Sequence, residues 1–289
     1  AIGWCLSLLQ RGSASMRRID EVMEEKTEII PKDNVTLQFI PKGEIEFRDV
    51  NFRYDCDKEW ILKGIHLRIP TGQRTAIVGP IGSGKSTLIN MLSRIIPVND
   101  QSIFIDGVDI NTIDIKALRK YIGFVPQETF LFSERIEDNI LFGVETGKDT
   151  NNVQQFARIA GIEEEIQELP QKYESYLGER GINLSGGQKQ RITMARALAI
   201  QPSIIILDDC LSAVDARVEG TIMKNILKNF PGRTLLVVTH RLPAIRGFDM
   251  IVVMKEGVIV ERGTHEQLIT ANGLYTSLYT KEVLEERLG

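Results

Sequence analysis

Three short segments near the start of the chain alternate apolar and polar residues. They are EIEFRDVNFRY (44–54), ILKGIHLRI (61–69) and SIFIDGVDI (102–110), and the last contains a turn signal at Asp106 and Gly107. Alternation with a period of two is typical of a strand that buries one face and exposes the other. We therefore predict a small antiparallel sheet in this part of the chain.

Later strands are predicted from uninterrupted apolar runs. RTAIVG (74–79), SIIILDD (203–209) and TLLVVTH (234–240) are rich in β-branched residues. Such runs are typical of parallel strands that are covered on both faces. Helical patterns separate them, and the stretch from about 130 to 200 is predicted to be mostly helical, so the fold class is α/β. The segment DMIVVMKEGVIVERG (249–263) predicts a hairpin that turns at Glu256 and Gly257.

The first thirty residues have a different character. AIGWCLSLL is apolar, but it is far shorter than the roughly 20 residues that span a bilayer. Arg11, Arg17 and Arg18 follow closely, and positive charge behind an apolar segment marks the cytoplasmic side of a membrane helix. We interpret residues 1–30 as the end of a transmembrane helix continued by a cytoplasmic helix. The alternative is an ordinary amphipathic helix that packs on the domain. Residues 31–43, with two prolines and no helical period, are predicted to be a linker.

Composition narrows the class of protein without identifying it. The 289 residues are 43% hydrophobic and 26% charged, as in ordinary globular proteins. The formal net charge of −4 gives no electrostatic basis for binding nucleic acid. The cysteines Cys5, Cys56 and Cys210 are widely spaced and lack metal-ligand spacing, which indicates a reducing, cytoplasmic setting with buried or idle thiols.

A glycine-rich motif indicates a nucleoside-triphosphate site. GPIGSGKST (79–87) matches G-x-x-x-x-G-K-[ST] between a predicted strand and a helical pattern. Its glycines let backbone N–H groups surround phosphate oxygens, and the helix N-terminus adds positive potential. Lys85 is expected to reach the β- and γ-phosphates and Ser86 to bind Mg²⁺. The nucleotide-binding candidates in this loop are Gly79, Gly82, Ser83, Gly84, Lys85, Ser86 and Thr87.

A second helix start with anion-binding character lies in LSGGQKQR (184–191). Ser185, Gly186 and Gly187 precede the helical run ITMARALAI. Only one predicted strand ends in adjacent carboxylates, Asp208 and Asp209, of the kind that hold a metal ion. The chain thus has two predicted phosphate-binding helix starts but only one strand that could hold a metal. One explanation is that the second helix start serves a nucleotide bound to another copy or to a partner.

In this order and spacing, GPIGSGKST, VPQE, LSGGQKQR, IIILDD, LSAVD and VVTHR resemble the ATPase domain of an ABC transporter. The resemblance covers about residues 44–280, and LSGGQ is the signature of that family. It implies a P-loop NTPase fold of ABC type over 44–289, with a mixed, mainly parallel core sheet, an antiparallel β-subdomain and a helical subdomain at about 130–200. It also implies ATP and Mg²⁺ as ligands. The start of the chain resembles the end of the last membrane helix of exporters that carry membrane and ATPase segments in one chain.

The resemblance assigns roles around the nucleotide. Tyr54 corresponds to an aromatic residue that stacks on adenine, with an exposed strand aromatic as the alternative. Gln127 corresponds to a glutamine that contacts Mg²⁺ and the attacking water, and His240 to a histidine that contacts the γ-phosphate. The catalytic candidates are Asp209, His240 and Gln127, and the metal-binding candidates are Ser86, Gln127 and Asp208.

Other residues are expected to face partners. In a head-to-tail sandwich, Ser185 and Gly187 contact the γ-phosphate of an ATP held by a second ABC ATPase domain. Glu179, in LGERG, resembles a segment that contacts the coupling helices of a transmembrane domain, and no nucleic acid is expected. The candidates for binding the partner's ATP are Leu184, Ser185, Gly186, Gly187, Gln188 and Asp215.

The sequence departs from the family pattern after the metal-binding aspartate. The usual D-E-A-T-S-A-L-D is D-D-C-L-S-A-V-D here, so Asp209 replaces the glutamate that acts as catalytic base. Loss of one methylene retracts the carboxylate by roughly 1 Å, and a misplacement of that size costs about 10²-fold in rate. We expect slow ATP hydrolysis at this site and a non-identical partner that brings the glutamate, as in heterodimeric bacterial exporters. The alternative is a competent homodimer in which the loop moves to compensate.

The expected location is the cytoplasmic face of the cell membrane, with the fragment itself soluble. An ABC ATPase that acts on DNA or ribosomes is disfavoured, because the sequence has no long heptad arms and no basic surface pattern. A kinase or GTPase with the same loop is disfavoured by LSGGQ and by the absence of N-K-x-D.

Overall fold

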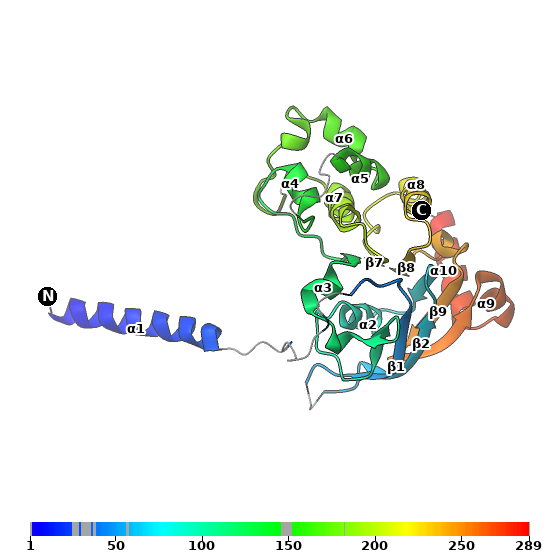
Figure 1. Ribbon diagram of the computed structural model, residues 1–289, viewed down its shortest axis with the longest axis horizontal. Coiled ribbons are helices and arrows are strands. Elements are labelled where there is room, and N and C mark those ends of the chain that lie inside the picture. Colours follow the sequence, from blue (N-terminus) through cyan, green and yellow to red (C-terminus); the bar gives the residue numbers. More distant parts are fainter. Residues whose placement is uncertain are drawn as a thin grey trace. The chain divides into compact units, whose positions relative to one another are not determined.

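The computed structural model describes residues 2–24, 29, 36, 39–55, 58–145, 152–181 and 183–288, with side chains as far as residue 284. Cys56 lies outside the described residues. Internal contacts divide the chain into two units, Ala1–Pro31 and Lys32–Gly289 (Figure 1).

In its described part, the first unit contains the helix α1 (Ile2–Glu24), which runs continuously from the apolar start into the charged stretch. None of its side chains is buried, and Ile2, Trp4 and Leu9 are among the exposed apolar ones. No helix in the described part of the chain is both long enough and apolar enough to cross a membrane. The interpretation of residues 1–30 as the end of a membrane helix stays a prediction.

The predicted antiparallel sheet is confirmed. Its strands lie in the order β2-β1-β4-β5, and each neighbouring pair is antiparallel. Ile45, Phe47 and Val50 bury the inner face of β1. The turn between β4 and β5 falls at Asp106 and Gly107, both of which have positive φ, as predicted. The strands are β1 (Ile45–Phe52), β2 (Leu62–Ile69), β4 (Ile103–Ile105) and β5 (Val108–Asp109).

The core sheet has the order β10-β9-β3-β8-β7-β6, in which β10 alone is antiparallel to its neighbour. The three apolar runs form its centre, and the hairpin between β9 and β10 turns at Glu256 and Gly257, as predicted. The edge strand β6 was not predicted. The strands are β3 (Arg74–Val78), β6 (Ile122–Val125), β7 (Ile204–Asp208), β8 (Thr234–Val238), β9 (Met250–Lys255) and β10 (Val258–Gly263).

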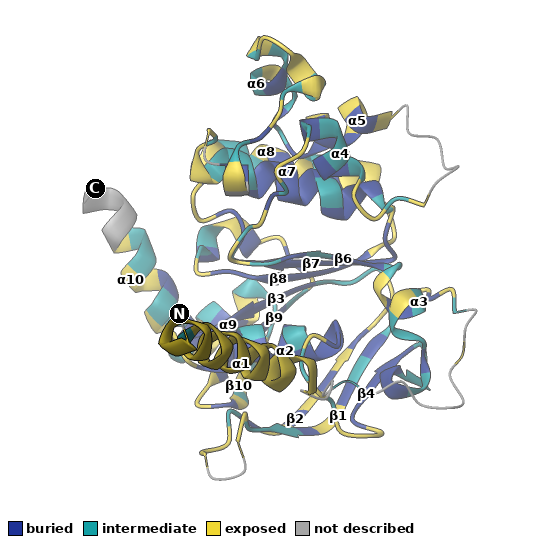
Figure 2. Ribbon diagram, turned by 90° about the vertical axis from the view of Figure 1, so that its left-hand side faces the viewer, coloured by how far each residue is buried: buried dark blue, intermediate teal, exposed yellow. Residues whose placement is uncertain are grey.

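The core sheet is covered on both faces, as its continuous apolar strands require. Ile204 and Ile206 of β7 pack into the cluster that includes α2 and the antiparallel sheet. Ile205 and Leu207 pack into the cluster on the other face, toward α4, α5, α7 and α8 (Figure 2). The α-helices of this unit are α2 (Lys85–Leu92), α3 (Ile115–Arg119), α4 (Ile136–Leu141), α5 (Val153–Ile159), α6 (Glu163–Glu168), α7 (Gly186–Ala199), α8 (Ala216–Asn229), α9 (His265–Ala271) and α10 (Leu274–Leu288).

The stretch predicted to be mostly helical, 130–200, contains α4 to α7. Short 3₁₀ helices complete the connections; they are η1 (Ile110–Thr112), η3 (Lys172–Glu174), η4 (Glu179–Gly181) and η5 (Leu242–Ile245). This arrangement brings the C-terminal ends of β3, β7 and β8 to one edge of the sheet, where ligands bind in open α/β folds.

Candidate nucleotide-binding site

The phosphate loop joins β3 to α2 and depends on glycine at two positions. Gly79 has φ 146°, and a Cβ placed on it would lie 2.1 Å from the carbonyl oxygen of Met254 in β9. Gly84, at φ 95°, forms the N-cap of α2, and a Cβ there would lie 2.7 Å from Leu62 Cδ2. The left-handed backbone therefore favours glycine at both positions, and at Gly79 the contact with a backbone carbonyl excludes any Cβ.

Lys85 occupies the centre of this loop. Its Nζ donates hydrogen bonds to the carbonyl oxygens of Gly79 and Pro80, at 2.9 and 2.8 Å, and to Ser83 Oγ at 3.3 Å. Burial lowers the pKa of Lys85, although the nearby Asp208 and Asp209 act to raise it. The hydrogen-bond acceptors of this ammonium group are neutral here, and negatively charged phosphate oxygens would replace them when a nucleotide binds.

Ser86 and Asp208, both predicted to bind Mg²⁺, are hydrogen-bonded to each other. Ser86 Oγ donates to Asp208 Oδ1 at 3.2 Å, which links the start of α2 to the end of β7. Asp208 is buried, and this burial raises the pKa of its carboxyl group above the ordinary value. A hydroxyl beside a desolvated carboxylate fits Mg²⁺, which takes oxygen ligands and would relieve the buried charge.

No cluster of three or more His, Cys, Asp or Glu side chains that could hold a metal occurs among the residues described.

These groups line one open pocket of about 560 Å³. Tyr54 is at one side, with its hydroxyl 3.3 Å from Thr87 Oγ1 and 57% of its surface exposed. Gln127 and His240 both reach the pocket. Its lining residues are Tyr54, Ile61, Ile81, Gly82, Ser83, Gly84, Lys85, Ser86, Thr87, Gln127, Asp208, Asp209, Val238 and His240.

Asp209 stands beside Asp208 in this pocket with an unusual backbone. Its φ is +43°, in the left-handed region that costs a non-glycine residue about 1 kcal/mol or more. Three hydrogen bonds hold it there. Its N–H donates to the Val238 carbonyl at 2.8 Å, and its carbonyl accepts from Ser212 Oγ at 2.9 Å and from the Ser212 N–H at 3.5 Å. The next residue, Cys210, is buried, and burial raises its thiol pKa, as expected for an idle thiol. Cys5 is exposed.

The LSGGQ segment forms the start of α7, as predicted. Ser185 is the N-cap: its Oγ accepts from the Gln188 N–H at 3.2 Å, and Gln188 Oε1 accepts from the Ser185 N–H at 2.9 Å. Gln188 Nε2 also donates to Glu165 Oε2 at 2.8 Å. The hydroxyl of Ser185 is thus oriented at a helix N-terminus, where anions bind.

A family model described as ABC transporter matches residues 62–212. The chain belongs to the ABC transporter family. It is 43% identical over 285 residues to the "Probable multidrug resistance ABC transporter ATP-binding/permease protein YheI" of Bacillus subtilis, a match that covers 98% of this chain and 48% of that protein. It is 41% identical over 276 residues to the "ATP-dependent lipid A-core flippase" of Desulfotalea psychrophila, covering 96% and 48%.

The structure is similar to that of a bacterial Atm1-family ABC exporter with ATP bound. The TM-score is 0.88 at 35% sequence identity, and the match covers 95% of this chain and 48% of the other. The chain therefore spans about half the length of these ABC relatives, and it has the ABC-type P-loop NTPase fold that was predicted.

This ABC domain brings only part of the predicted site together. The phosphate loop, Tyr54, Gln127 and His240 converge, whereas none of the signature residues lines the pocket in the described part of the domain. Asp215 does not line the pocket either; it caps α8 by accepting the N–H groups of Arg217 and Val218. Glu179 lies at the start of η4.

Three residues of the ABC domain's pocket escaped the sequence analysis: Ile61, Ile81 and Val238. They are apolar residues without chemistry of their own. Ile81 lies at an unspecified position of GPIGSGKST and Val238 lies within VVTHR, whereas Ile61 belongs to no motif.

Proposed function

We propose that this chain is the ATP-driven motor domain of an ABC exporter. Binding of ATP in the pocket around Lys85 closes a head-to-tail pair of such domains, and hydrolysis reopens it. The observation that carries the proposal is the convergence of the phosphate loop, the Ser86–Asp208 pair and His240 in one pocket. Family membership supports it, and the names of its relatives, a flippase and an exporter among them, support export as the process.

The residues of the pocket have distinct tasks in this proposal. Backbone N–H groups of the phosphate loop and Lys85 bind the phosphates, and Ser86, Gln127 and Asp208 hold Mg²⁺. Mg²⁺ neutralises charge on the phosphates when it is bound. Tyr54 supplies an exposed aromatic face for adenine. His240 binds the terminal phosphate, and Asp209 orients the attacking water.

The site's own hydrolysis is slow, because Asp209 has one methylene fewer than the glutamate of the family pattern. The left-handed backbone at Asp209 supports this idea: hydrogen bonds at both of its peptide groups restrain the movement that would bring the shorter carboxylate forward. We infer that a non-identical partner brings a glutamate, and that Ser185 to Gln188 complete its site. The transmembrane domain would bind near Glu179 on the cytoplasmic face of the membrane.

Binding and turnover of ATP test the proposal directly. We expect the chain to bind Mg-ATP, measured by calorimetry, and Lys85→Ala to weaken that binding. Asp209→Glu should raise single-turnover hydrolysis by about 10²-fold, while Asp209→Asn binds ATP as the wild type does. An unchanged rate in Asp209→Glu would refute the slow site alone. Absence of ATP binding by the wild-type chain would refute the motor function.

A further inference from the structure

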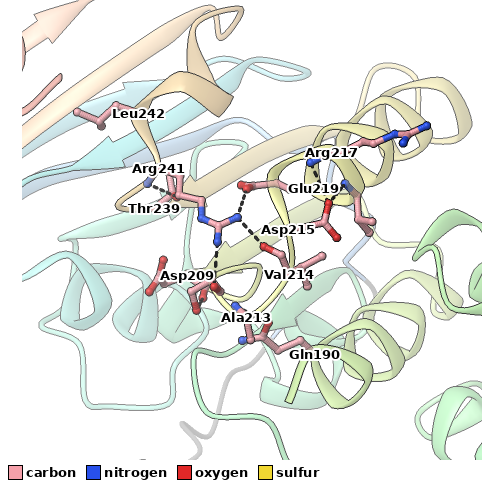
Figure 3. Close-up of polar contacts among 12 residues, drawn as sticks. Gln190, Asp209, Ala213, Val214, Asp215, Arg217, Glu219, Thr239, Arg241 and Leu242 are labelled. Carbon is pink, nitrogen blue, oxygen red and sulfur yellow. Dashed lines mark hydrogen bonds and ion pairs between the residues drawn. The ribbon is translucent and has the colours of Figure 1, made fainter. Parts of the chain in front are cut away.

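One arginine ties together the segments that follow β7 and β8. Arg241 comes directly after His240, and its guanidinium points across to the loop between β7 and α8 (Figure 3). Its Nη1 donates to the Val214 carbonyl at 2.6 Å and its Nη2 to the Ser212 carbonyl at 3.0 Å. Two backbone acceptors of one loop are therefore held by a single rigid group.

The guanidinium is itself held by a buried carboxylate. Arg241 Nη1 lies 2.8 Å from Glu219 Oε2 in the first turn of α8, and the Glu219 side chain is only 7% exposed. Arg241 itself is about a third exposed, so the pair is desolvated on the Glu219 side, and its several hydrogen bonds make it more directional than a pair on the surface. The Arg241 N–H also donates to Thr239 Oγ1 at 2.9 Å, which fixes the turn that carries His240.

The loop held by Arg241 has a candidate functional residue at each end. At its start, the Asp209 carbonyl accepts from Ser212 Oγ, so Ser212 links Arg241 to the residue with the left-handed backbone. At its end, Asp215 caps α8. Between them, the Ala213 N–H lies 3.3 Å from Gln190 Oε1 of α7, the helix that begins at the signature segment.

We propose that Arg241 is a positioning residue for ATP hydrolysis, which holds the loop Asp209–Asp215 in register with His240. This inference rests on the proposed function. Arg241 is not among the residues that line the nucleotide pocket, so it acts through the loop and touches no nucleotide. The candidate base, the phosphate-contacting histidine and the loop facing the partner then keep one geometry when ATP binds. Arginine suits this task, because its planar fork serves several acceptors at once, whereas lysine is a point charge.

Substitution of Arg241 separates positioning from binding. In Arg241→Gln, we expect kcat for Mg-ATP, measured by release of labelled phosphate, to fall by about 10-fold or more, because small displacements of a catalytic group cost large factors in rate. The Kd for ATP should change by less than about twofold, since the phosphate loop is untouched. Arg241→Lys keeps a cation beside Glu219 but cannot bind the Ser212 and Val214 carbonyls together. Its kcat should therefore lie between those of the wild type and Arg241→Gln.

Arg246→Gln is the matched control. Arg241 and Arg246 flank the 3₁₀ helix η5 at its N-terminal and C-terminal ends. The Arg246 guanidinium stacks over the Tyr279 ring, 5.0 Å from the centroid. The Arg246→Gln substitution removes one positive charge without changing a contact of the Asp209–Asp215 loop, so kcat should stay within about twofold of the wild type. Amide hydrogen exchange gives an independent readout: exchange in residues 212–216 should accelerate in Arg241→Gln and stay unchanged in α2.

The possible outcomes are distinct. An Arg241→Gln protein with wild-type kcat overturns the inference, and so does a parallel loss of kcat, ATP affinity and exchange protection throughout the domain, which would mean a merely structural role. If Arg241→Gln does not fold, Arg241→Lys is judged by the same criteria. A wild-type chain that neither binds nor turns over ATP overturns the proposed function and this inference with it.

Discussion

Glycine is required at position 79 because of a neighbour in β9, and not only because of its backbone conformation. A Cβ on Gly79 would clash with the Met254 carbonyl, whereas a Cβ on Gly82, which also has positive φ, would meet nothing within 4 Å. We expect Gly79→Ala to lower the free energy of unfolding by about 3 kcal/mol and to abolish ATP binding. Gly82→Ala should cost only about 1 kcal/mol of backbone strain.

Urea unfolding of both variants checks this difference, with ATP binding measured in parallel. Equal losses in the two variants would mean that the clash with Met254 is relieved by movement of β9, contrary to the expectation.

At the scale of single residues, the sequence identified those whose chemistry is tied to a motif. The structure brings Lys85, Ser86 and Asp208 to one pocket, because the phosphate-loop spacing and the end of a buried strand leave little freedom, and their roles in binding phosphate and Mg²⁺ stay predictions. Arg241 was missed. Its partners, Glu219 and two backbone carbonyls, are brought to it by tertiary folding. An arginine that follows a histidine forms no sequence pattern from which such contacts could be predicted.

Among the helices, α7 and α9 begin with the same device. Ser185 and Thr264 are both N-caps in complete capping boxes, each with a glutamine three residues later. Ser185→Ala and Thr264→Ala should each lower the free energy of unfolding by about 1 kcal/mol, because each leaves a backbone N–H without its acceptor. Only Ser185→Ala should also lower the rate of ATP hydrolysis, because only Ser185 is proposed to contact a partner's nucleotide.

Thermal unfolding and phosphate release, measured on both variants, separate capping from function. Equal hydrolysis rates in the two would remove the proposed role of the Ser185 hydroxyl and leave it as a helix cap.

Arg74 and Asp249 join the starts of β3 and β9. Arg74 Nε donates to Asp249 Oδ2 at 2.9 Å, and its hydrogen bonds hold the pKa of Asp249 below the ordinary value. A lowered pKa contributes stability above the pKa of the unfolded chain, and this contribution is lost as the pH falls through the folded value. Asp249→Asn should therefore lower the free energy of unfolding by less than about 1 kcal/mol at pH 7, since both side chains are partly exposed. In strong acid the substitution should not change the free energy of unfolding.

Urea unfolding of Asp249→Asn and the wild type as a function of pH tests the sign. A difference in stability that grows as the pH is lowered would contradict it.

Prediction of the strands succeeded where the sequence alternates apolar and polar residues or contains a long β-branched run. The alternation in 44–54 and 61–69 gave β1 and β2, and the three apolar runs gave the centre of the core sheet. The strand β6 was missed because IGFV is short and contains a glycine, so it shows neither alternation nor a long β-branched run. Gly123 has a tertiary reason that no local pattern carries: a Cβ there would lie 2.6 Å from the Ala197 carbonyl of α7.

At the scale of the whole domain, the proposed head-to-tail partner rests on the separation of the signature segment from the nucleotide pocket among the described residues. A site divided between two chains forms twice in a head-to-tail pair. Two copies of this chain carry both halves, so at high concentration they should substitute for the native pair. In an Asp209→Glu background, Lys85→Ala disables the phosphate loop and Ser185→Arg obstructs the signature helix start, and each variant alone should be inactive.

Mixed in equal amounts, the two variants should recover activity. Half of the dimers then contain one chain of each kind, and each mixed dimer has one intact site, so the rate should reach about a quarter of that of the Asp209→Glu chain. Without Asp209→Glu the same mixture should stay slow, because the intact composite site still has the shorter carboxylate. Phosphate release across mixing ratios measures both. A mixture that never exceeds its components would mean that the site does not draw on a second chain, and the head-to-tail arrangement would then be wrong.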